Sequence, residues 1–196
     1  MSDFAFYFNL GLDHVLDING FDHALFIIAL TVPFTFKNWK TVLLLLTLFT
    51  IGHTISLLLS VYEVVVIKND LLVEFLLQLT ILAAALYNFV KLKKAASGQN
   101  ITVVAFTTLF FGIIHGFGFS RYLKMILGDT EREKLFPLLE FALGIEIAHI
   151  IVAVVLLIIS YVVQNFFRFS RRDWILVTSA FVMGVILPII IENEIW

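Results

Sequence analysis

Six long apolar runs constrain this chain more than any other feature of its sequence. They cover roughly residues 21–36, 40–62, 71–91, 101–121, 135–163 and 174–192. A hydrocarbon core of about 30 Å needs about 20 apolar residues in helical form. The runs are unbroken, whereas the strands of a membrane barrel alternate apolar and polar residues. We therefore expect an all-α, polytopic membrane helical bundle with about six transmembrane helices.

Composition supports this class of protein and excludes several others. The chain has 196 residues, of which 61% are hydrophobic and 14% charged, against about half and about a quarter in soluble domains. Its net charge of −2 gives no basic surface for nucleic acid. It contains no cysteine, which excludes disulfides and thiolate metal sites. Short loops predict a single integral membrane domain over residues 1–196, in contact with membrane lipid and of open oligomeric state.

The segment before the first run and the charges between the runs give a topology. Residues 4–16 are too few to cross, so we expect an interfacial or re-entrant helix there. One side of the membrane receives Lys37, Lys40, Lys91, Lys93, Lys94, Arg168, Arg171 and Arg172, and the other receives Lys68, Arg121, Lys124, Arg132 and Lys134. Since positive loops stay in the cytoplasm, we expect the first side to be cytoplasmic and both termini to lie outside.

All five histidines lie in or at the edge of a predicted span. Ionisable groups within a span cost about 2.5–3.5 kcal/mol each on insertion scales, so they suggest a function. At 1.5 Å per residue, His53 and His115 lie about 20 Å from the cytoplasmic ends of their spans. By the same topology, His14 and His23 lie near the outer face and His149 near the middle. The histidines are thus expected to gather in the outer half of the bundle.

Local spacing places further polar groups beside them. Glu146 and His149 are three residues apart and share one face of a helix. In "DHVLDINGFDH", His14 and His23 are nine residues apart and meet only if the chain bends between them. Residues 17–20, which end in Gly20, are suited to such a bend. Two half-helices with Asp22 and both histidines at their join would resemble the broken helices of transporter ion sites.

Two further patterns concern helix packing. Glu74, Gln78 and Asn88 form a polar stripe on the third predicted span. The stripe fits equally the lining of a pathway and hydrogen bonding between helices. Gly112 and Gly116, four residues apart, predict a surface where two helices pack closely.

Imidazole and carboxylate ligands without thiolate suit Zn²⁺, Ni²⁺, Co²⁺ or Fe²⁺. Ligand type does not choose among these metals, and the affinity order would even favour Cu²⁺, so geometry or supply must select.

Four motifs together add a resemblance. "GFDHALF", "FTIGHTISLLL", "FFGIIHGFGFS" and "FALGIEIAH" resemble the HupE/UreJ family of hydrogenase- and urease-associated membrane proteins, which are proposed nickel or cobalt permeases. The motif positions that match are His14, Asp22, His23, His53, His115 and Glu146. His149 stands where the family often has glutamine. The resemblance implies metal handling in the inner (cytoplasmic) membrane of a bacterium.

These observations leave three functions open. The first is a permease for a divalent metal, nickel or cobalt, with a site made of His14, Asp22, His23, His53, His115, Glu146 and His149. The second is an intramembrane metal-dependent hydrolase, with zinc as its metal and Ser56 or Glu146 assisting attack on a lipid-like substrate. The third is a metal-sensing or accessory protein. The inner half of the predicted bundle offers few polar residues besides Asn88, which counts against an evident path through it.

Overall fold

The computed structural model describes residues 3–17, 20–93, 101–127 and 134–195, and the regular elements in these ranges are all helices. They are α1 (Asp3–Leu16), α2 (Asp22–Thr31), the 3-10 helix η2 (Phe36–Asn38), α3 (Trp39–Val61), α4 (Asp70–Lys93), α5 (Ile101–Leu127), α6 (Leu135–Asn165) and α7 (Arg171–Glu192). The helices α3 to α7 are long and apolar enough to cross a membrane. The expected helical membrane bundle is confirmed, and the chain is an integral membrane protein.

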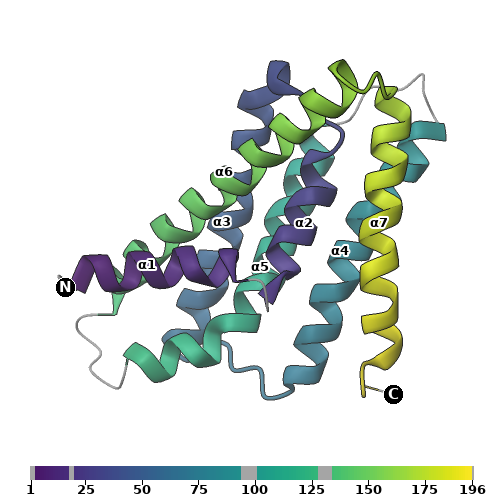
Figure 1. Ribbon diagram of the computed structural model, residues 1–196. Coiled ribbons are helices and arrows are strands. Elements are labelled where there is room, and N and C mark those ends of the chain that lie inside the picture. The colour runs from purple at the N-terminus through teal and green to yellow at the C-terminus, as the bar shows by residue number, and fades with distance from the viewer. Residues whose placement is uncertain (1–2, 18–19, 94–100, 128–133, 196) are drawn as a thin grey trace.

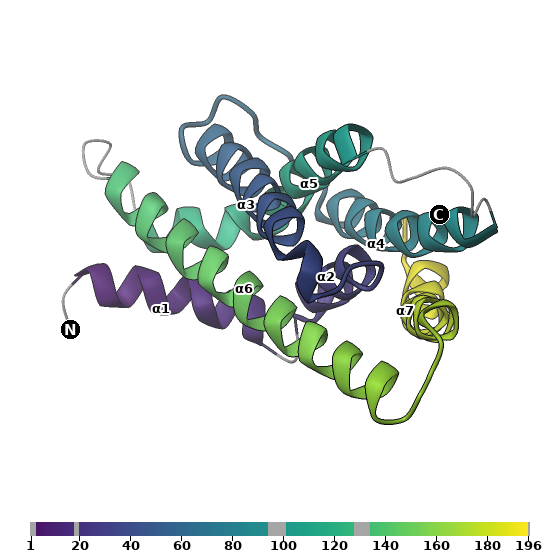
Figure 2. The same cartoon turned by 90° about the horizontal axis from the view of Figure 1, so that it is seen from above.

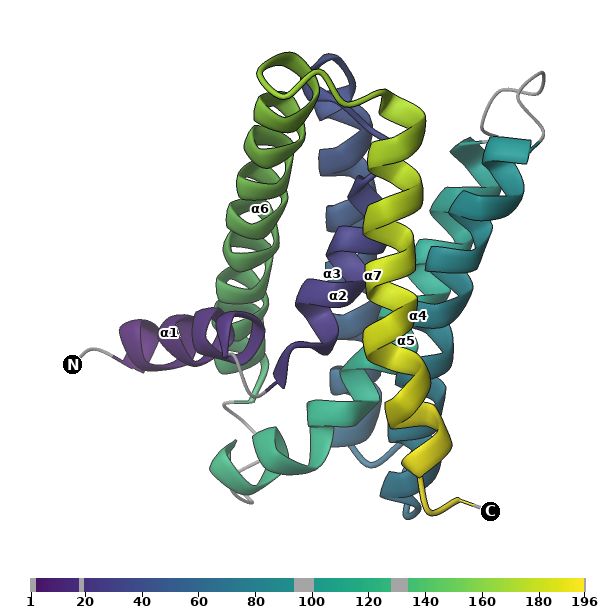
Figure 3. The ribbon, with the colours of Figure 1, turned by 45° about the vertical axis from the view of Figure 1, so that its right-hand side comes forward.

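The helices surround one short central helix (Figures 1 and 2). Viewed from above, α2 lies in the middle of the bundle, and it contacts α4, α6 and α7. The helix α1 lies across the upright helices, as the view in Figure 3 shows, and packs mainly against α6. The predicted short N-terminal helix is therefore present, and it adds to the bundle without spanning it.

The first predicted span is shorter than expected. We predicted a span over residues 21–36, whereas α2 covers only ten residues and is followed by turns before η2. Pro33 explains the difference, since proline has no N–H to donate to the carbonyl of Ala29. Val32 still has helical backbone and its N–H bonds to Ile28 O at 3.0 Å. Seven residues of α2 are buried. Because other helices enclose it, its backbone can end at membrane depth without exposing polar groups to lipid.

Neighbouring side chains satisfy the carbonyl groups at this proline end of α2. The carbonyl of Ala29 would normally bond to the N–H of residue 33, which Pro33 lacks. Asn88 Nδ2 of α4 instead donates to Ala29 O at 2.8 Å and to Ser179 Oγ of α7 at 3.2 Å. Arg171 Nη2 donates to Pro33 O at 2.6 Å. The interrupted helix is thus held by α4 and α7.

Glycines set the close crossing of α1 and α6. A side-chain carbon on Gly11 would collide with the carbonyl of Phe141, and one on Gly144 would collide with the carbonyl of Phe8. The two backbones therefore touch at these residues, and α1 can occupy its place only because both positions lack a side chain. This crossing fixes where the C-terminal turn of α1 lies.

A second glycine contact joins α3 and α5. A side-chain carbon on Gly112 would meet the carbonyl of Phe49, and one on Gly116 would meet the carbonyl of His53. Gly52 of α3 approaches the backbone of α5 in the same way. The prediction that Gly112 and Gly116 form a close-packing surface is confirmed.

The ends of the bundle carry the charges in the predicted arrangement. The segments with Lys37, Lys91 and Arg171 lie at one end, at the top of Figure 1. The end of α3, the start of α6 and the end of α7 lie at the other. Lys94 and Arg132, which also entered the topology prediction, lie outside the described residues.

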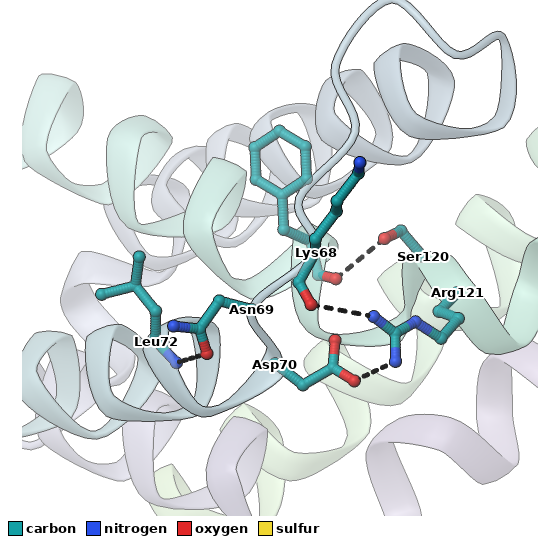
Figure 4. A network of polar contacts seen from close by, with 7 residues as sticks. Lys68, Asn69, Asp70, Leu72, Ser120 and Arg121 are labelled. Atoms are coloured by element: carbon teal, nitrogen blue, oxygen red, sulfur yellow. Dashed lines mark hydrogen bonds and ion pairs between the residues drawn. The ribbon is translucent and has the colours of Figure 1, made fainter. Parts of the chain in front are cut away.

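Polar contacts attach the end of α5 to the start of α4 (Figure 4). Arg121 pairs with Asp70 and also donates to the carbonyl oxygen of Lys68. Asn69 accepts from the N–H of Leu72 at 3.1 Å and so caps α4. The Arg121 contacts thus join the part of α5 that carries Phe119 to the start of α4.

Candidate metal centre

The bend between α1 and α2 brings His14 and His23 together. The two helices are separated by residues 17–21, and the N–H of Gly20 donates to Asp17 O at 3.1 Å within this turn. The centroids of the two imidazole rings are 4.7 Å apart. In a continuous helix these rings would lie on opposite faces, so the predicted bend is confirmed.

His53 of α3 completes a compact group of three imidazoles. Its ring centroid is 5.7 Å from that of His14 and 5.4 Å from that of His23. One nitrogen from each ring lies within 4.8 Å of the other two. Two nitrogens that bind one metal at 2.0–2.1 Å are at most about 4.2 Å apart. Small rotations of the rings would therefore suffice to close this group around an ion.

His115 of α5 and His149 of α6 lie beside the same group. Their ring centroids are 5.2 and 5.8 Å from that of His23. His23 is thus in ring contact with all four other histidines. We call these five residues, His14, His23, His53, His115 and His149, the histidine cluster. It draws on α1, α2, α3, α5 and α6.

Every ring of the histidine cluster has a buried nitrogen without a hydrogen-bond partner in the described chain. The exposed fractions of His23, His53, His115 and His149 are 5%, 0%, 1% and 0%. The unpartnered atoms are His14 Nε2, His23 Nε2, both ring nitrogens of His53, His115 Nδ1 and His149 Nε2. Because nearly all buried polar groups in proteins are hydrogen-bonded, five such rings at one place indicate a site for a ligand.

Two threonines hold the other nitrogen of two cluster rings. Thr80 Oγ1 of α4 lies 2.9 Å from His115 Nε2. Thr50 Oγ1 of α3 lies 3.0 Å from His149 Nδ1. In known metal sites, ligating histidines are generally oriented by such a bond from the second ring nitrogen.

The two predicted carboxylates occupy different places around the histidine cluster. Glu146 accepts hydrogen bonds from Thr47 Oγ1 at 2.7 Å and Thr50 Oγ1 at 2.5 Å. It lines a separate, mainly apolar groove between α3 and α6, and reaches the cluster through Thr50. Asp22 lines the pocket that leads to His23.

This pocket lies between the C-terminal part of α1, the start of α2, the first part of α4 and the second half of α5, and its volume is about 710 Å³. Its polar lining consists of Asp13, His14, Asp17, Asp22, His23, Glu74, His115 and Tyr122. Carboxylates in a concave site with apolar walls raise the local concentration of cations. The pocket lining thus combines these carboxylates with the rings of His14, His23 and His115.

A stacked aromatic pair lies against the other side of the histidine cluster. Phe26 follows His23 by one turn of α2, and Phe49 precedes His53 by about one turn of α3. Their ring centroids are 4.5 Å apart, and each lies about 5 Å from the His115 ring. Both are almost fully buried. They separate the histidine cluster from the proline end of α2.

The polar stripe on α4 divides between the two interpretations left open by the sequence. Glu74 lines the pocket beside the histidine cluster. Asn88 instead makes hydrogen bonds to α2 and α7. Gln78 is buried between them, and its Oε1 has no partner among the described residues.

Sequence reasoning missed three residues around the histidines. Thr50 could have been found, because Thr47 and Thr50 are three residues apart on the helix that carries His53. Thr80 gives no local signal, since its distance from His115 depends on how α4 packs on α5. Phe119 covers His14 at a ring-centroid distance of 3.9 Å, which also depends only on tertiary packing.

Comparison with known families agrees with the motifs. A family model described as HupE / UreJ protein matches residues 1–192, almost the whole chain. Comparisons with curated proteins and with solved structures gave no significant match.

Proposed function

The chain belongs to the HupE/UreJ family, and from this premise we propose that it binds a divalent transition metal in the histidine cluster and transports it across the membrane. The metal is the transported substrate, nickel or cobalt, with zinc as the competing possibility. The proposed site comprises His14, Asp22, His23, His53, His115, Glu146 and His149. Within it, the histidines are the direct ligands. Asp22 lines the pocket, and Glu146 accepts a hydrogen bond from the Thr50 hydroxyl, which contacts His149.

The observation that carries this proposal is the set of unpartnered ring nitrogens around His23. Neutral imidazole nitrogen is a good ligand for nickel, cobalt and zinc. Burying such atoms without partners costs free energy. A bound cation would offset that cost, whereas a structural role for the same rings would require hydrogen bonds.

The pocket supplies the proposed route to the site. Its lining includes the first turns of α4 and the last turns of α5, which lie towards the end opposite the segments with Lys37, Lys91 and Arg171. By the positive-inside rule that end faces the exterior of the cell, and we propose the cytoplasmic membrane of a bacterium as the location. Metal ions would then enter from outside past the carboxylates.

Transport through the bundle also requires the stacked pair of Phe26 and Phe49 to move. They lie between the histidine cluster and the cytoplasmic end, so transport needs this pair to separate. The structure fits a state that is open to the outer pocket and closed at the aromatic pair. A change between two such states is the usual basis of alternating access.

Hydrolysis is less well supported than transport. Ser56 is fully buried, and its hydroxyl donates to the carbonyl oxygen of His53 at 2.9 Å. Glu146 accepts from two threonines in a separate groove. Neither candidate residue for attack on a substrate therefore faces the open pocket.

The test uses the purified protein in detergent and in liposomes. Elemental mass spectrometry should find nickel, cobalt or zinc bound to the protein. Liposomes that contain it should accumulate Ni²⁺ or Co²⁺, and His53→Ala should abolish both binding and uptake. Thr107→Ala on the exposed face of α5 is the control, since its hydroxyl donates only to a carbonyl of its own helix.

Two results would contradict the proposal in different ways. Full uptake by His53→Ala would remove the histidine cluster as the site. Tight metal binding without any uptake would leave the site in place and replace transport by a sensing or accessory function.

A further inference from the structure

The hydroxyl of Thr80 determines which nitrogen of His115 carries the proton. A threonine hydroxyl has one proton to donate, and Thr80 gives it to the carbonyl oxygen of Leu77 at 2.7 Å. With that proton committed to Leu77 O, the Thr80 oxygen accepts from His115 Nε2, 2.9 Å away. Nε2 then carries the proton of the neutral ring, which leaves the lone pair on Nδ1. His115 Nδ1 is the buried nitrogen that has no partner among the described residues.

Thr50 imposes the opposite arrangement on His149. If the Glu146 carboxyl is ionised, it only accepts hydrogen bonds, and Thr50 donates its proton to it at 2.5 Å. The oxygen of Thr50 then accepts from His149 Nδ1 at 3.0 Å. The lone pair of this ring lies on Nε2, which is again the buried nitrogen without a partner in the described chain. Thr47 occupies the second carboxylate oxygen of Glu146 at 2.7 Å.

We infer that Thr50 and Thr80 are positioning residues that fix opposite tautomers of His149 and His115, so that each ring turns a lone pair towards a cation in the histidine cluster. The identity of that cation rests on the proposed function, whereas the tautomers do not. Glu146, by this inference, acts as the acceptor that sets the proton of Thr50. The two threonines come from α3 and α4, and the two histidines from α6 and α5, so the packing of four helices makes the assignment.

The tautomers are opposite because Thr80 faces Nε2 of His115, whereas Thr50 faces Nδ1 of His149. Each threonine has its own acceptor for the hydroxyl proton. One acceptor is a backbone carbonyl one turn away on the same helix, and the other is a carboxylate on a neighbouring helix. In both cases the hydroxyl proton is already committed before the imidazole is considered. A valine at either position keeps the shape of threonine and removes this control.

The first measurement needs no metal. Nitrogen-15 spectra of the metal-free protein, labelled at histidine and recorded where imidazole is neutral, distinguish the two tautomers of each ring. We expect protonated Nδ1 in His149 and protonated Nε2 in His115. Thr50→Val should produce mixed tautomers of His149 only, and Thr80→Val mixed tautomers of His115 only. Thr50→Ser and Thr80→Ser should restore the original signals, and Thr31→Val is the control.

Thr31 suits this purpose because it is also buried, and its hydroxyl donates to the carbonyl oxygen of Ile27 without touching a histidine. Titration with Ni²⁺ gives the second measurement. Loss of an outer partner of a ligating histidine typically weakens metal affinity by about 10–100-fold, and we expect this loss in both valine variants, with recovery in the serine variants.

The outcomes separate this inference from the proposed function. Unprotonated Nδ1 in His149, or tautomers that do not respond to the valine substitutions, would overturn the inference even in a protein that transports nickel. The expected tautomers in a protein that binds no metal would support the inference and contradict the proposed function.

Discussion

The two ends of α2 differ in how the polar groups of this helix itself are paired. At the proline end, Asn88 and Arg171 donate to the carbonyl groups of Ala29 and Pro33, and the hydroxyl of Thr31 donates to its own helix. At the other end, His23 lies among four further imidazoles, and its Nε2 has no partner in the described chain. The ends are fewer than ten residues apart and are similarly buried.

Under the proposed function, this difference distinguishes polar residues that support the fold from residues that would hold a metal. A buried group that supports the fold has its hydrogen bonds satisfied, because an unmet group costs about 1–3 kcal/mol. Asn88 fits this description, since it replaces the N–H that Pro33 lacks. The histidine cluster does not, and its open nitrogens are what a metal requires.

The largest effect should come from His23→Leu. Removing the ring that touches the other four should weaken Ni²⁺ binding more than 100-fold, or by more than about 2.7 kcal/mol. The metal-free protein should remain as stable as the wild type or become more so, because the substitution removes an unpartnered polar atom and keeps an apolar volume. Metal titration and denaturant unfolding in detergent measure the two quantities. A loss of stability in the metal-free variant would contradict this prediction, because the His23 ring would then support the fold as Asn88 does.

Gly144→Ala should have the next largest effect. Its side-chain carbon would collide with the carbonyl of Phe8, so α1 must move away from α6 and carry His14 with it. Such overpacking costs about 1–3 kcal/mol, and metal affinity should fall with it. Unfolding in detergent and metal titration test both effects.

Gly184→Ala is the matched control on α7, where a side-chain carbon meets nothing within 4 Å. It should gain about 0.5–1 kcal/mol of stability, since alanine favours a helix over glycine, and leave metal binding unchanged. Equal behaviour of the two variants would show that the α1–α6 crossing does not position His14.

Asn88→Leu should have the smallest effect and the opposite pattern to His23→Leu. The carbonyl of Ala29 and the hydroxyl of Ser179 lose a partner, which should cost about 1–2 kcal/mol of stability. Metal affinity should stay unchanged. Asn165→Leu, which removes an exposed bond within α6, should change stability by less than about 0.5 kcal/mol. A fall in the metal affinity of Asn88→Leu would show that Asn88 contributes to metal binding, contrary to this prediction.

Helix positions were largely predictable from the sequence, apart from α2. The apolar runs located α3, α4, α6 and α7 to within three residues, because the thickness of the hydrocarbon core fixes the length of a spanning helix. The helix α5 continues six residues beyond its predicted end. Residues 21–36 were the exception. There the apolar run continues past Pro33, and only the enclosure by other helices lets the chain stop at Thr31.

The candidate site was predictable in its residue types and in part in its location. A fixed topology already placed the histidines at similar depths, and the spacing of His14 and His23 required a bend. The glycine contacts that seat α1 against α6 were not predicted, and neither were the threonines behind His115 and His149. Their partners are 35 residues away or more along the chain, beyond the reach of helical periodicity.

The sequence by itself determined that the chain is a membrane bundle and that its unusual ionisable residues are histidines without cysteine. Both conclusions follow from the transfer of side chains and backbone into lipid, which depends on composition and run length. Only the tertiary structure decided that five rings meet at His23, that Asn88 bonds to α2 and α7, and that Glu146 accepts a hydrogen bond from Thr50. These are matters of which atoms satisfy which hydrogen bonds, and packing between distant segments settles them.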